Sequence, residues 1–270
     1  MTTAIHPTLE AVTVVANERV TTGVGLLILE APVTARRTAP GQFVHLRIGR
    51  DTSELLRRPF SVHRASGTRI EILYQVLGAG TARLALVEPG DRSLDVVGPL
   101  GRGWDIPVDA THALLVTGGL GAAPMGMLAE ALAGRGVAAV VAMGAPTATR
   151  LVARSLFEDV TRRVEVATDD GSSGTRGFVT AVSDRLLREE RFDVVYVCGP
   201  EAMQRIVADQ ARAASVACQV SLERLMACGI GACLSCVVTT VTGQKRACVD
   251  GPVFDAEEVV WNASEIPPKH

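Results

Sequence analysis

Four of the six cysteines lie within 21 residues near the end of the chain: Cys228, Cys233, Cys236 and Cys248. The first three form the pattern C-x4-C-x2-C, and eleven residues separate the third from the fourth. This is the ligand spacing of plant-type [2Fe–2S] centres, in which cysteine thiolates hold the irons. The first two cysteines are separated by a stretch with two glycines, which lets the backbone approach inorganic sulfur without a Cβ in the way. The spacing therefore predicts a cluster that transfers one electron at a time.

The same four thiols have other possible uses. A structural zinc ion also takes four cysteines, but zinc ribbons favour two C-x2-C pairs, whereas here three cysteines fall in one run. A disulfide framework suits a short secreted chain, and 270 residues is not short. The spacing favours the iron–sulfur cluster, with zinc or a chance grouping as the alternatives.

The composition indicates a globular chain without a nucleic-acid or membrane partner. With 270 residues there is room for one large or two medium domains and a small module, and the hydrophobic share of 47% supplies their cores. The net charge of −2 and the aromatic share of 4% offer little to phosphates or stacked bases. The first residues lack a basic stretch followed by an apolar one, and no apolar run reaches about 18 residues. We expect no signal peptide, no transmembrane helix and a reducing, cytoplasmic location.

Residues 1–105 have the pattern of an antiparallel β-domain. Strands are predicted by short apolar or alternating runs at 12–15, 26–29, 43–48 and 69–74. Turns are predicted by Pro-Gly or Ser-Gly pairs at 40–41, 66–67 and 89–90. Short strands at this spacing, with little helix between them, indicate a small antiparallel barrel.

From about residue 112 strands alternate with helices. Buried strands are predicted at 113–117, 137–143, 164–168 and 194–198. Helices are predicted at 124–132, 178–188 and 201–214. The alternation predicts a parallel sheet of the dinucleotide-binding kind, with ligands at the carboxyl ends of its strands. We therefore divide the chain into residues 1–105, 106–215 and 216–270, the last being the cysteine module.

The run Arg57-Arg-Pro-Phe-Ser61 has residue types that can hold a flat ligand with a diphosphate. Pro59 fixes its φ angle, so the neighbouring backbone groups are held rigidly. Arg58 can fork onto a diphosphate, Phe60 can lie beside an aromatic ring system, and Ser61 can hydrogen-bond a ring nitrogen. An ordinary edge strand with a proline and a solvated arginine has the same sequence, so the run is ambiguous by itself.

A glycine turn follows at Leu73-Tyr-Gln-Val-Leu-Gly-Ala-Gly-Thr81. Its two glycines leave the backbone bare, and Thr81 is placed to cap a helix that starts near Ala82. Since a capped helix N-terminus binds phosphate, the turn is a second candidate contact for the same ligand. A plain glycine turn is the alternative.

A second glycine turn, Gly118-Gly-Leu-Gly-Ala-Ala-Pro124, lies between a predicted strand and a predicted helix. Gly119 and Gly121 are the candidates for contact with a pyrophosphate. Pro124 takes the place of the third glycine in the G-x-G-x-x-G pattern, where it suits the first turn of a helix. Tight packing of the strand against the helix is the alternative use of these glycines.

Two further strand ends carry candidates. Asp169 and Asp170 follow the strand at 164–168, where acids bind ribose hydroxyls and repel a 2′-phosphate, so they favour NAD. Arg150 leaves NADP possible. Cys198 ends the strand at 194–198 and is placed to face a nicotinamide. A solvated turn and a buried structural cysteine are the alternatives.

Several of these runs occur together in one order: Arg58-Pro-Phe-Ser61, Gly80-Thr81, Gly119-Leu-Gly121 and Cys198-Gly-Pro200. In this order they resemble the ferredoxin–NADP reductase superfamily. The tail contains Glu223-Arg-Leu-Met-Ala-Cys228-Gly-Ile-Gly-Ala-Cys233-Leu-Ser-Cys236 and Ala247-Cys248-Val-Asp-Gly-Pro-Val-Phe254. It resembles the electron-transfer subunit of B-type, NAD-dependent dihydroorotate dehydrogenase. The resemblance covers nearly the whole chain, and the tail is its most specific part.

The resemblance implies an FAD-binding barrel, an NAD-binding domain and a C-terminal [2Fe–2S] module. The residues implied for FAD are Arg58, Pro59, Phe60, Ser61, Leu73, Tyr74, Gln75, Gly80 and Thr81. For the pyridine nucleotide the resemblance implies the turn with Gly119 and Gly121, and Cys198 as the catalytic residue at the nicotinamide. Asp169, predicted from its position after a strand, completes this site. The implied cluster ligands are Cys228, Cys233, Cys236 and Cys248.

The resemblance also implies a partner, an FMN-containing subunit that oxidises dihydroorotate in pyrimidine biosynthesis, in a heterotetramer with two of each chain. Electrons would pass singly through the cluster, collect on FAD and leave as a hydride to NAD+. A partner surface is expected at the apolar residues near the cysteines, namely Leu225, Met226, Ile230 and Leu234. The same layout also serves NAD(P)H–ferredoxin oxidoreductases and some hydrogenase subunits, and a redox sensor without enzymatic activity is a third interpretation.

Overall fold

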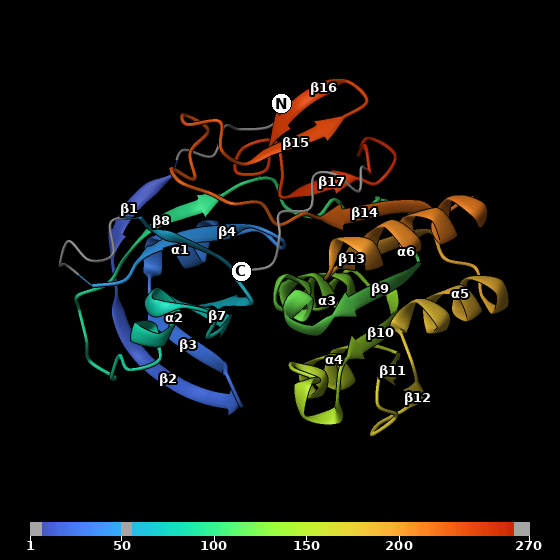
Figure 1. Ribbon diagram of the computed structural model, residues 1–270, viewed down its shortest axis with the longest axis horizontal. Helices are drawn as coiled ribbons and strands as arrows, with labels where there is room; N and C mark the ends of the chain where they lie inside the picture. Colours follow the sequence, from blue (N-terminus) through green and yellow to red (C-terminus); the bar gives the residue numbers. More distant parts are fainter. Residues whose placement is uncertain (1–6, 50–55, 262–270) are drawn as a thin grey trace.

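The computed structural model describes residues 7–49 and 56–261, which fold into three adjoining parts (Figure 1). Antiparallel β-structure comes first, and a parallel sheet with helices on both faces follows. The cysteine-bearing segment, residues 222–252, lies at the top of the view in Figure 1, above both parts. This arrangement places the cysteine loop next to each of the two larger parts.

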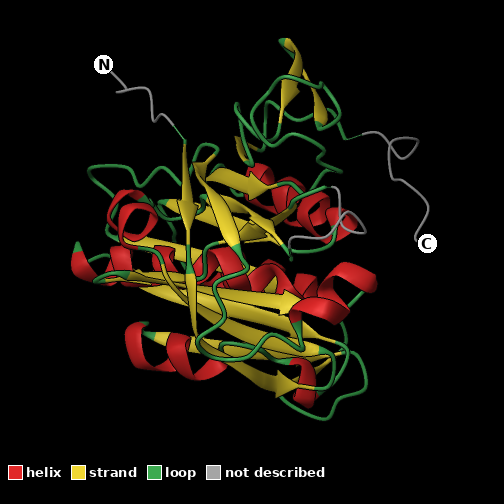
Figure 2. Cartoon of the chain, turned by 90° about the vertical axis from the view of Figure 1, so that its left-hand side faces the viewer, coloured by secondary structure: helices red, strands yellow, loops and turns green. Residues whose placement is uncertain are grey.

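The antiparallel part consists of two four-stranded sheets, ordered β1-β8-β4-β5 and β2-β3-β7-β6. The first sheet contains β1 (Thr8–Ala11), β8 (Asp95–Leu100), β4 (Phe43–Arg47) and β5 (Arg58–Ser61). The second contains β2 (Thr13–Thr21), β3 (Val24–Glu30), β7 (Arg69–Gln75) and β6 (Arg64–Ser66). Two short helices accompany them, α1 (Pro32–Arg37) and α2 (Ala79–Leu84). The predicted antiparallel barrel is confirmed as two sheets around one core, seen from that side of the molecule in Figure 2.

Alternation of apolar side chains builds that core. Leu27 and Leu29 of β3 and Ile70 and Ile72 of β7 are fully buried and belong to the same hydrophobic cluster as Val44 of β4. Since successive side chains of a strand point to opposite faces, a one-residue slip would turn this whole set outward. The alternation therefore fixes the register of β7 and β4, the strands beside the predicted flavin residues.

The second part is a seven-stranded sheet ordered β12-β11-β10-β9-β13-β14-β17. Its strands are β9 (His112–Gly118), β10 (Ala138–Ala145), β11 (Arg163–Thr168), β12 (Thr175–Arg176), β13 (Val194–Cys198), β14 (Ala217–Ser221) and β17 (Val253–Asp255). All pairs are parallel except β14 with β17. The chain starts at β9, proceeds outward through β10 and β11, and returns to the other side of β9 as β13. The strand order therefore reverses between β9 and β13, where open sheets of this kind bind their ligands.

Helices cover both faces of this sheet. They are α3 (Gly126–Gly134), α4 (Arg154–Val160), α5 (Val179–Glu189) and α6 (Glu201–Ala213). Leu114 and Val116 of β9 pack in one hydrophobic cluster with residues of α5 and α6, whereas Ala113 and Leu115 pack in another with residues of α3 and α4. A strand with both faces buried is typical of a parallel sheet, so the predicted nucleotide-binding architecture is confirmed.

Local structure departs from prediction at the glycine turn. A helix was expected over 124–132, but Gly119–Met125 form a 3-10 turn, η1, and the regular helix α3 begins only at Gly126. Pro124 thus lies inside η1 and not in the first turn of an α-helix. The reason is the glycine content of the turn, which lets the backbone fold closely onto the end of β13 before a regular helix starts. A second 3-10 turn, η2 (Ala148–Arg150), follows β10.

The cysteine-bearing segment includes a hairpin of β15 (Val237–Thr240) and β16 (Gly243–Arg246), which projects at the top of Figures 1 and 2. Its buried cysteines share a hydrophobic cluster with Phe43 and Leu100 of the antiparallel part. The N–H of Arg102 also donates to the Gly251 carbonyl at 2.5 Å. The limits 1–105, 106–215 and 216–270 stay a prediction, and two strands of the parallel sheet, β14 and β17, come from the last of these segments.

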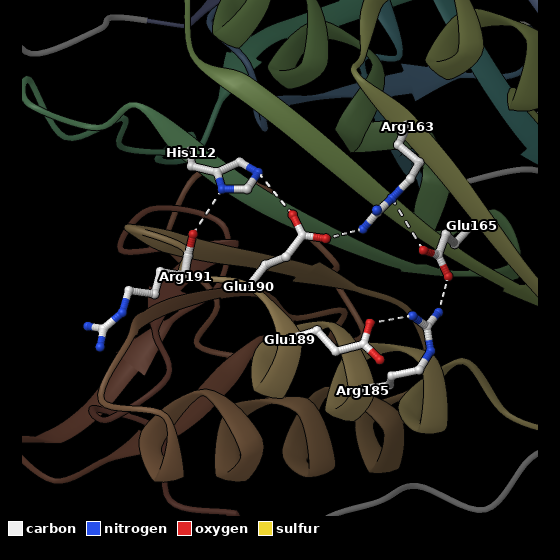
Figure 3. Close-up of polar contacts among 7 residues, drawn as sticks. All are labelled: His112, Arg163, Glu165, Arg185, Glu189, Glu190 and Arg191. Atoms are coloured by element: carbon white, nitrogen blue, oxygen red, sulfur yellow. Dashed lines mark hydrogen bonds and ion pairs between the residues drawn. The ribbon is translucent and has the colours of Figure 1, made fainter.

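The amino edge of the parallel sheet carries a network of charged side chains (Figure 3). Its members are His112, Arg163, Glu165, Arg185, Glu189, Glu190 and the carbonyl of Arg191. Arg163 pairs with both Glu165 and Glu190, which ties β11 to the end of α5. Ion pairs this close to solvent each contribute little to the free energy of folding. We therefore interpret the network as part of the protein surface and not as a binding site. The candidates for ligand binding lie at the opposite, carboxyl edge.

Candidate redox-cofactor site

The four predicted cysteine ligands are brought together as two pairs. The N–H of Cys233 donates to the Cys228 sulfur at 3.4 Å, and the N–H of Cys248 donates to the Cys236 sulfur at 3.4 Å. Cys236 and Cys248 are buried, Cys228 is partly exposed and Cys233 is exposed. One pair therefore faces the interior of the protein, and the other lies towards solvent.

This arrangement fits a two-iron cluster better than one zinc ion. A tetrahedral zinc would need four thiolates around one point. A [2Fe–2S] cluster instead needs two protein ligands on each of two irons, which is the paired pattern observed.

The two pairs differ in electrostatic environment. Hydrogen bonds from the Ser235 hydroxyl and backbone, then from Cys228, lower the pKa of the Cys233 thiol to about 6. Burial, followed by the neighbouring Cys236 thiol, raises the pKa of Cys248 to about 12. Cys233 is thus readily a thiolate, the form that binds iron, whereas Cys248 needs the positive charge of the metal to lose its proton.

The loop around the thiols is held by its own polar contacts. Gly229 and Gly231 have φ angles of 71° and 83°, in the left-handed region that favours glycine. The guanidinium of Arg246 donates to the Gly231 carbonyl at 3.1 Å, and the N–H of Ala247 donates to the Cys236 carbonyl at 2.8 Å. These contacts within the chain hold the loop in shape around the four thiols.

Part of the predicted partner surface is exposed around these thiols. The side chains of Leu225, Ile230 and Leu234 are 77%, 54% and 63% exposed. Met226 differs from the expectation because it is partly buried and packs against the core of the parallel sheet. Single apolar side chains on a protein surface are ordinary, but three large ones grouped beside the thiols are typical of a surface that contacts another protein.

The predicted flavin residues of β5 and β7 meet between the two antiparallel sheets. β5 is the edge strand of its sheet, and Arg58, Pro59, Phe60 and Ser61 are all half-buried. The ring of Phe60 lies edge-on to the ring of Tyr74, with centroids 6.5 Å apart. Arg58 donates to the Leu56 carbonyl through one guanidinium nitrogen.

Tyr74 has a structural side chain. It is 2% exposed, and its hydroxyl donates to Asn17 Oδ1 at 2.8 Å. A Cβ on Gly25 would lie 2.4 Å from the Tyr74 ring, so glycine is required opposite it. Any ligand contact at this position would come from the backbone of Tyr74 or from its neighbours Leu73, which is buried, and Gln75, which is half-buried.

The role predicted for Thr81 as a helix cap needs correction. The helix α2 begins at Ala79 with Gly78 as the capping residue, and Thr81 is the third helical residue. The Thr81 hydroxyl accepts hydrogen bonds from the N–H groups of Leu77 at 2.9 Å and Gly78 at 3.2 Å. The expected helix start was late because the glycines concealed the first turn. Gly80 is buried within it.

The glycine turn η1 packs against the end of β13, and its two candidate glycines have different surroundings. A Cβ on Gly121 would lie 2.2 Å from the carbonyl oxygen of Cys198, so Gly121 is required for packing. Gly119 has a φ of 56° and nothing within 4 Å of its would-be Cβ. Gly119 therefore has an open face, while Gly121 closes the turn onto the strand.

Cys198 and Asp169 both lie at the carboxyl edge of the sheet. Cys198 ends β13 opposite Thr117 of β9 and Ser221 of β14, and burial raises the pKa of its thiol far above the ordinary value. It is a neutral thiol and not a thiolate nucleophile. Asp169 is exposed after β11, whereas the carboxylate of Asp170 accepts from both the N–H and the hydroxyl of Ser172. Of the two acids, Asp170 is thus engaged with Ser172 within the turn.

Two buried histidines at this junction were not selected from the sequence. His63 Nδ1 lies 2.9 Å from the Ala123 carbonyl, and the His63 carbonyl accepts from the N–H of Met127 at 3.1 Å. His45 on β4 is fully buried beside the cysteine loop. The sequence feature that could have indicated His63 is its position, two residues after the Arg57–Ser61 run.

An antiparallel barrel, a nucleotide-type parallel sheet and a paired four-thiol loop define an iron–sulfur redox protein of the ferredoxin-reductase type. A solved structure of this type is the NADH-dependent reduced ferredoxin-NADP oxidoreductase, studied for flavin-based electron bifurcation. One of its chains superposes on this chain with a TM-score of 0.85 and 34% sequence identity. The alignment covers 93% of this chain and 90% of that chain.

Residues 223–260 match the iron-sulfur cluster binding domain of dihydroorotate dehydrogenase B. The dihydroorotate dehydrogenase B (NAD(+)), electron transfer subunit, of Desulforamulus reducens is 40% identical over 238 residues, which cover 86% of this chain and 90% of that protein. The corresponding subunit of Geobacillus thermodenitrificans is 40% identical over 261 residues, 93% of this chain and 98% of its own length. The chain belongs to this family, the electron transfer subunits of NAD-dependent dihydroorotate dehydrogenase B, and is thus an oxidoreductase subunit.

Proposed function

We propose that this chain carries electrons from an FMN-containing, dihydroorotate-oxidising partner to NAD+ in pyrimidine biosynthesis, through a [2Fe–2S] cluster and FAD. The observation that carries the proposal is the position of the buried pair of thiols, Cys236 and Cys248, which share one hydrophobic core with Phe43 and Leu100 of the barrel and with the parallel sheet. When bound, the cluster supplies single-electron transfer and the flavin couples it to hydride transfer. The chain itself supplies the positions and the surroundings of these groups.

FAD is assigned to the face formed by β5, β7 and α2. Arg58 offers a guanidinium to the diphosphate, and Phe60 lies beside the isoalloxazine. Ser61 and the backbone at Leu73, Tyr74 and Gln75 offer hydrogen bonds. The start of α2, with Gly80 and Thr81, takes the remaining phosphate contact. The edge position of β5 supports this assignment, because it leaves one side of the strand without a neighbouring strand.

NAD+ is assigned to the carboxyl edge of the parallel sheet, between β9 and β13. Gly119 approaches the pyrophosphate, and Gly121 holds the turn against β13. Asp169 binds the ribose hydroxyls and disfavours a 2′-phosphate. The role proposed for Cys198 is contact with the nicotinamide through a neutral thiol, which excludes water from the carbon that receives the hydride.

The partner surface is assigned to Leu225, Ile230 and Leu234, which surround the exposed pair of thiols. The cluster ligands are Cys228, Cys233, Cys236 and Cys248. The assembly we propose is a heterotetramer of two such chains and two catalytic subunits, located in the cytoplasm. In the part of the chain that the structure describes, no helix has the length and apolar character needed to span a membrane.

The test is reconstitution with the catalytic partner. The two chains are co-expressed, the complex is isolated through a tag on this chain, and dihydroorotate-dependent NAD+ reduction is measured. The chain alone should reduce artificial acceptors with NADH but should not oxidise dihydroorotate. Cys233→Ala should abolish the coupled reaction, while Cys218→Ala, at a buried cysteine outside the loop, should preserve it. A chain that elutes alone, or full coupled activity in Cys233→Ala, would contradict the proposal.

A second candidate is electron exchange between NAD(P)H and a ferredoxin. It is favoured by the likeness to the NADH-dependent reduced ferredoxin-NADP oxidoreductase, at 34% identity over nearly the full length. The discriminating assay offers the purified chain NADH with a [2Fe–2S] or [4Fe–4S] ferredoxin and, separately, with the catalytic partner and orotate. Ferredoxin reduction at the faster rate would favour this second function.

A further inference from the structure

His45 occupies the boundary between the proposed flavin strand and the cysteine loop. It lies on β4, where its backbone is paired with Pro59 of β5 on one side and with Val97 of β8 on the other. Its neighbours Val44 and Leu46 face the barrel core, so by strand alternation His45 points to the other side. The ring of Phe43, on the same side, lies edge-on to it with centroids 6.5 Å apart.

The side that His45 faces is the cysteine loop. A Cβ added to Gly229 would lie 2.7 Å from His45 Nδ1 and 3.0 Å from its Cε1. Gly229 directly follows Cys228, the first of the four thiols, and its φ of 71° already favours glycine. The glycine therefore serves two purposes: it shapes the loop, and it admits the imidazole of a residue more than 180 positions earlier in the chain.

The imidazole of His45 is buried without a well-formed hydrogen bond. Its side chain is fully buried, and among residues 7–49 and 56–261 neither Nδ1 nor Nε2 makes a hydrogen bond of good geometry, although the backbone carbonyl of Cys228 lies near the ring. An imidazole carries at least one N–H donor in either protonation state. Because a buried donor left unpaired is costly, an acceptor from outside the chain is expected beside it.

We propose that His45 is a positioning residue for the iron–sulfur cluster: its ring N–H donates to a sulfur of the bound cluster or of its Cys228 ligand and holds that side of the cluster against β5. The inference rests on the proposed function, which places a [2Fe–2S] cluster on the four thiols. Hydrogen bonds to sulfur stabilise the more negative, reduced cluster and so raise its reduction potential. His45 then sets both the place of the cluster beside the flavin strand and the ease of its reduction.

The competing interpretation is that His45 only fills space. Two substitutions of His45 distinguish this packing role from a hydrogen bond to the cluster. His45→Leu keeps an apolar side chain of useful volume but removes the donor. His45→Gln keeps an N–H. His112→Gln, at the amino edge of the parallel sheet, is the matched histidine control. Each protein is purified anaerobically as the full chain with FAD, and iron, sulfide and FAD are counted before a redox titration followed by visible and EPR spectra.

The expected result is a lower midpoint potential in His45→Leu. At the potential where the unsubstituted cluster is half reduced, the ratio of reduced to oxidised cluster should fall about tenfold, or 59 mV for a one-electron couple. His45→Gln should recover most of this shift, and His112→Gln should show none. An unchanged potential in His45→Leu with the cluster retained would overturn the inference.

A measurement on the unsubstituted protein decides the matter if His45→Leu fails to retain its cluster. The chain is labelled with ¹⁵N in the histidine rings, and the reduced cluster is examined by electron–nuclear double resonance. A ring ¹⁵N coupling that disappears in His45→Gln supports the hydrogen bond, and absence of any ring ¹⁵N coupling overturns it. If the unsubstituted chain has no [2Fe–2S] signal at all, the proposed function is contradicted. If the cluster is present but its potential and its ¹⁵N coupling do not depend on His45, only the inference about His45 is contradicted.

Discussion

The ring of His63 and the carbonyl of Ala123 are joined across the junction of the two larger parts of the chain, with Nδ1 2.9 Å from the oxygen. His63 follows the flavin run by two residues, and Ala123 lies in the glycine turn. Gly126 leaves room for the ring, since a Cβ there would lie 2.7 Å from it. The contact ties the segment that follows β5 to η1, and so helps to set the separation between the proposed flavin face and the glycine turn.

Loss of this contact should weaken NADH binding more than FAD binding. We expect His63→Ala to raise KM for NADH about fivefold, the equivalent of one net hydrogen bond, with a smaller change in kcat and a normal FAD content. His63→Asn should restore most of the loss, because its amide N–H can replace Nδ1–H. Steady-state kinetics with an artificial acceptor measure this. Equal defects in the two variants, or FAD loss from both, would show that the residue only fills space.

His63 should also make stability depend on pH. Burial lowers the pKa of His63 below its ordinary 6.5, opposed in part by the Ala123 carbonyl. Below pH 6.5 the unfolded chain therefore binds a proton that the folded chain resists, and stability falls as pH falls, by at most about 1.4 kcal/mol per pH unit. Above pH 6.5 this contribution is constant.

The measurement for this effect is denaturant unfolding between pH 5 and 7.5, with FAD in excess, for the parent and for His63→Asn. The variant should show the shallower decline below pH 6.5. His45 titrates in both proteins, so its contribution cancels in the comparison. Parallel pH profiles would contradict the assignment.

Gly121 should tolerate no side chain. The Cβ of Gly121→Ala would lie 2.2 Å from the Cys198 carbonyl oxygen, which is a backbone atom and cannot rotate away. We expect a loss of at least about 1–3 kcal/mol in unfolding free energy, together with weaker NADH binding. Gly134→Ala, on the same segment but with nothing within 4 Å of its Cβ, is the control and should be neutral or stabilising by up to about 1 kcal/mol. Thermal unfolding of both variants measures the difference.

Cluster content should depend on the loop thiols alone. Protein purified without air should contain about two irons and two acid-labile sulfides per chain. Cys233→Ala should lose them and keep FAD, since the flavin face lies in the barrel. Cys218→Ala should keep both, because Cys218 packs within the core of the parallel sheet. One zinc per chain without labile sulfide would refute the cluster.

The ion pair of Glu201 and Arg224 should stabilise the start of the cysteine loop, because Arg224 lies four residues before Cys228. Arg224 contacts both carboxylate oxygens of Glu201, at 2.8 and 3.3 Å, and both side chains are mostly shielded from solvent. A double-mutant cycle with Glu201→Gln and Arg224→Met should give a coupling of about 1–2 kcal/mol. Arg224→Met should also lose iron faster in air than the parent. A coupling near zero would mean that the two charges are independently solvated.

The sequence by itself determined the parts and the chemistry they carry. The cysteine spacing defined a cluster loop, because a metal-binding loop needs its ligands at short, fixed separations. Alternating runs such as 43–48 located the barrel strands, and the alternation of strand and helix after residue 112 located the parallel sheet. These are local signals, since each depends on side chains within a few residues of one another.

Only the tertiary structure decided how distant residues are used. It paired Cys228 with Cys233 and Cys236 with Cys248, and it buried one pair while exposing the other. It separated Gly121, which packs, from Gly119, which is open, although both stand in one turn. It also brought His45 to Gly229 across most of the chain. Such contacts depend on how whole sheets pack together, and no pattern within a short stretch of sequence contains that information.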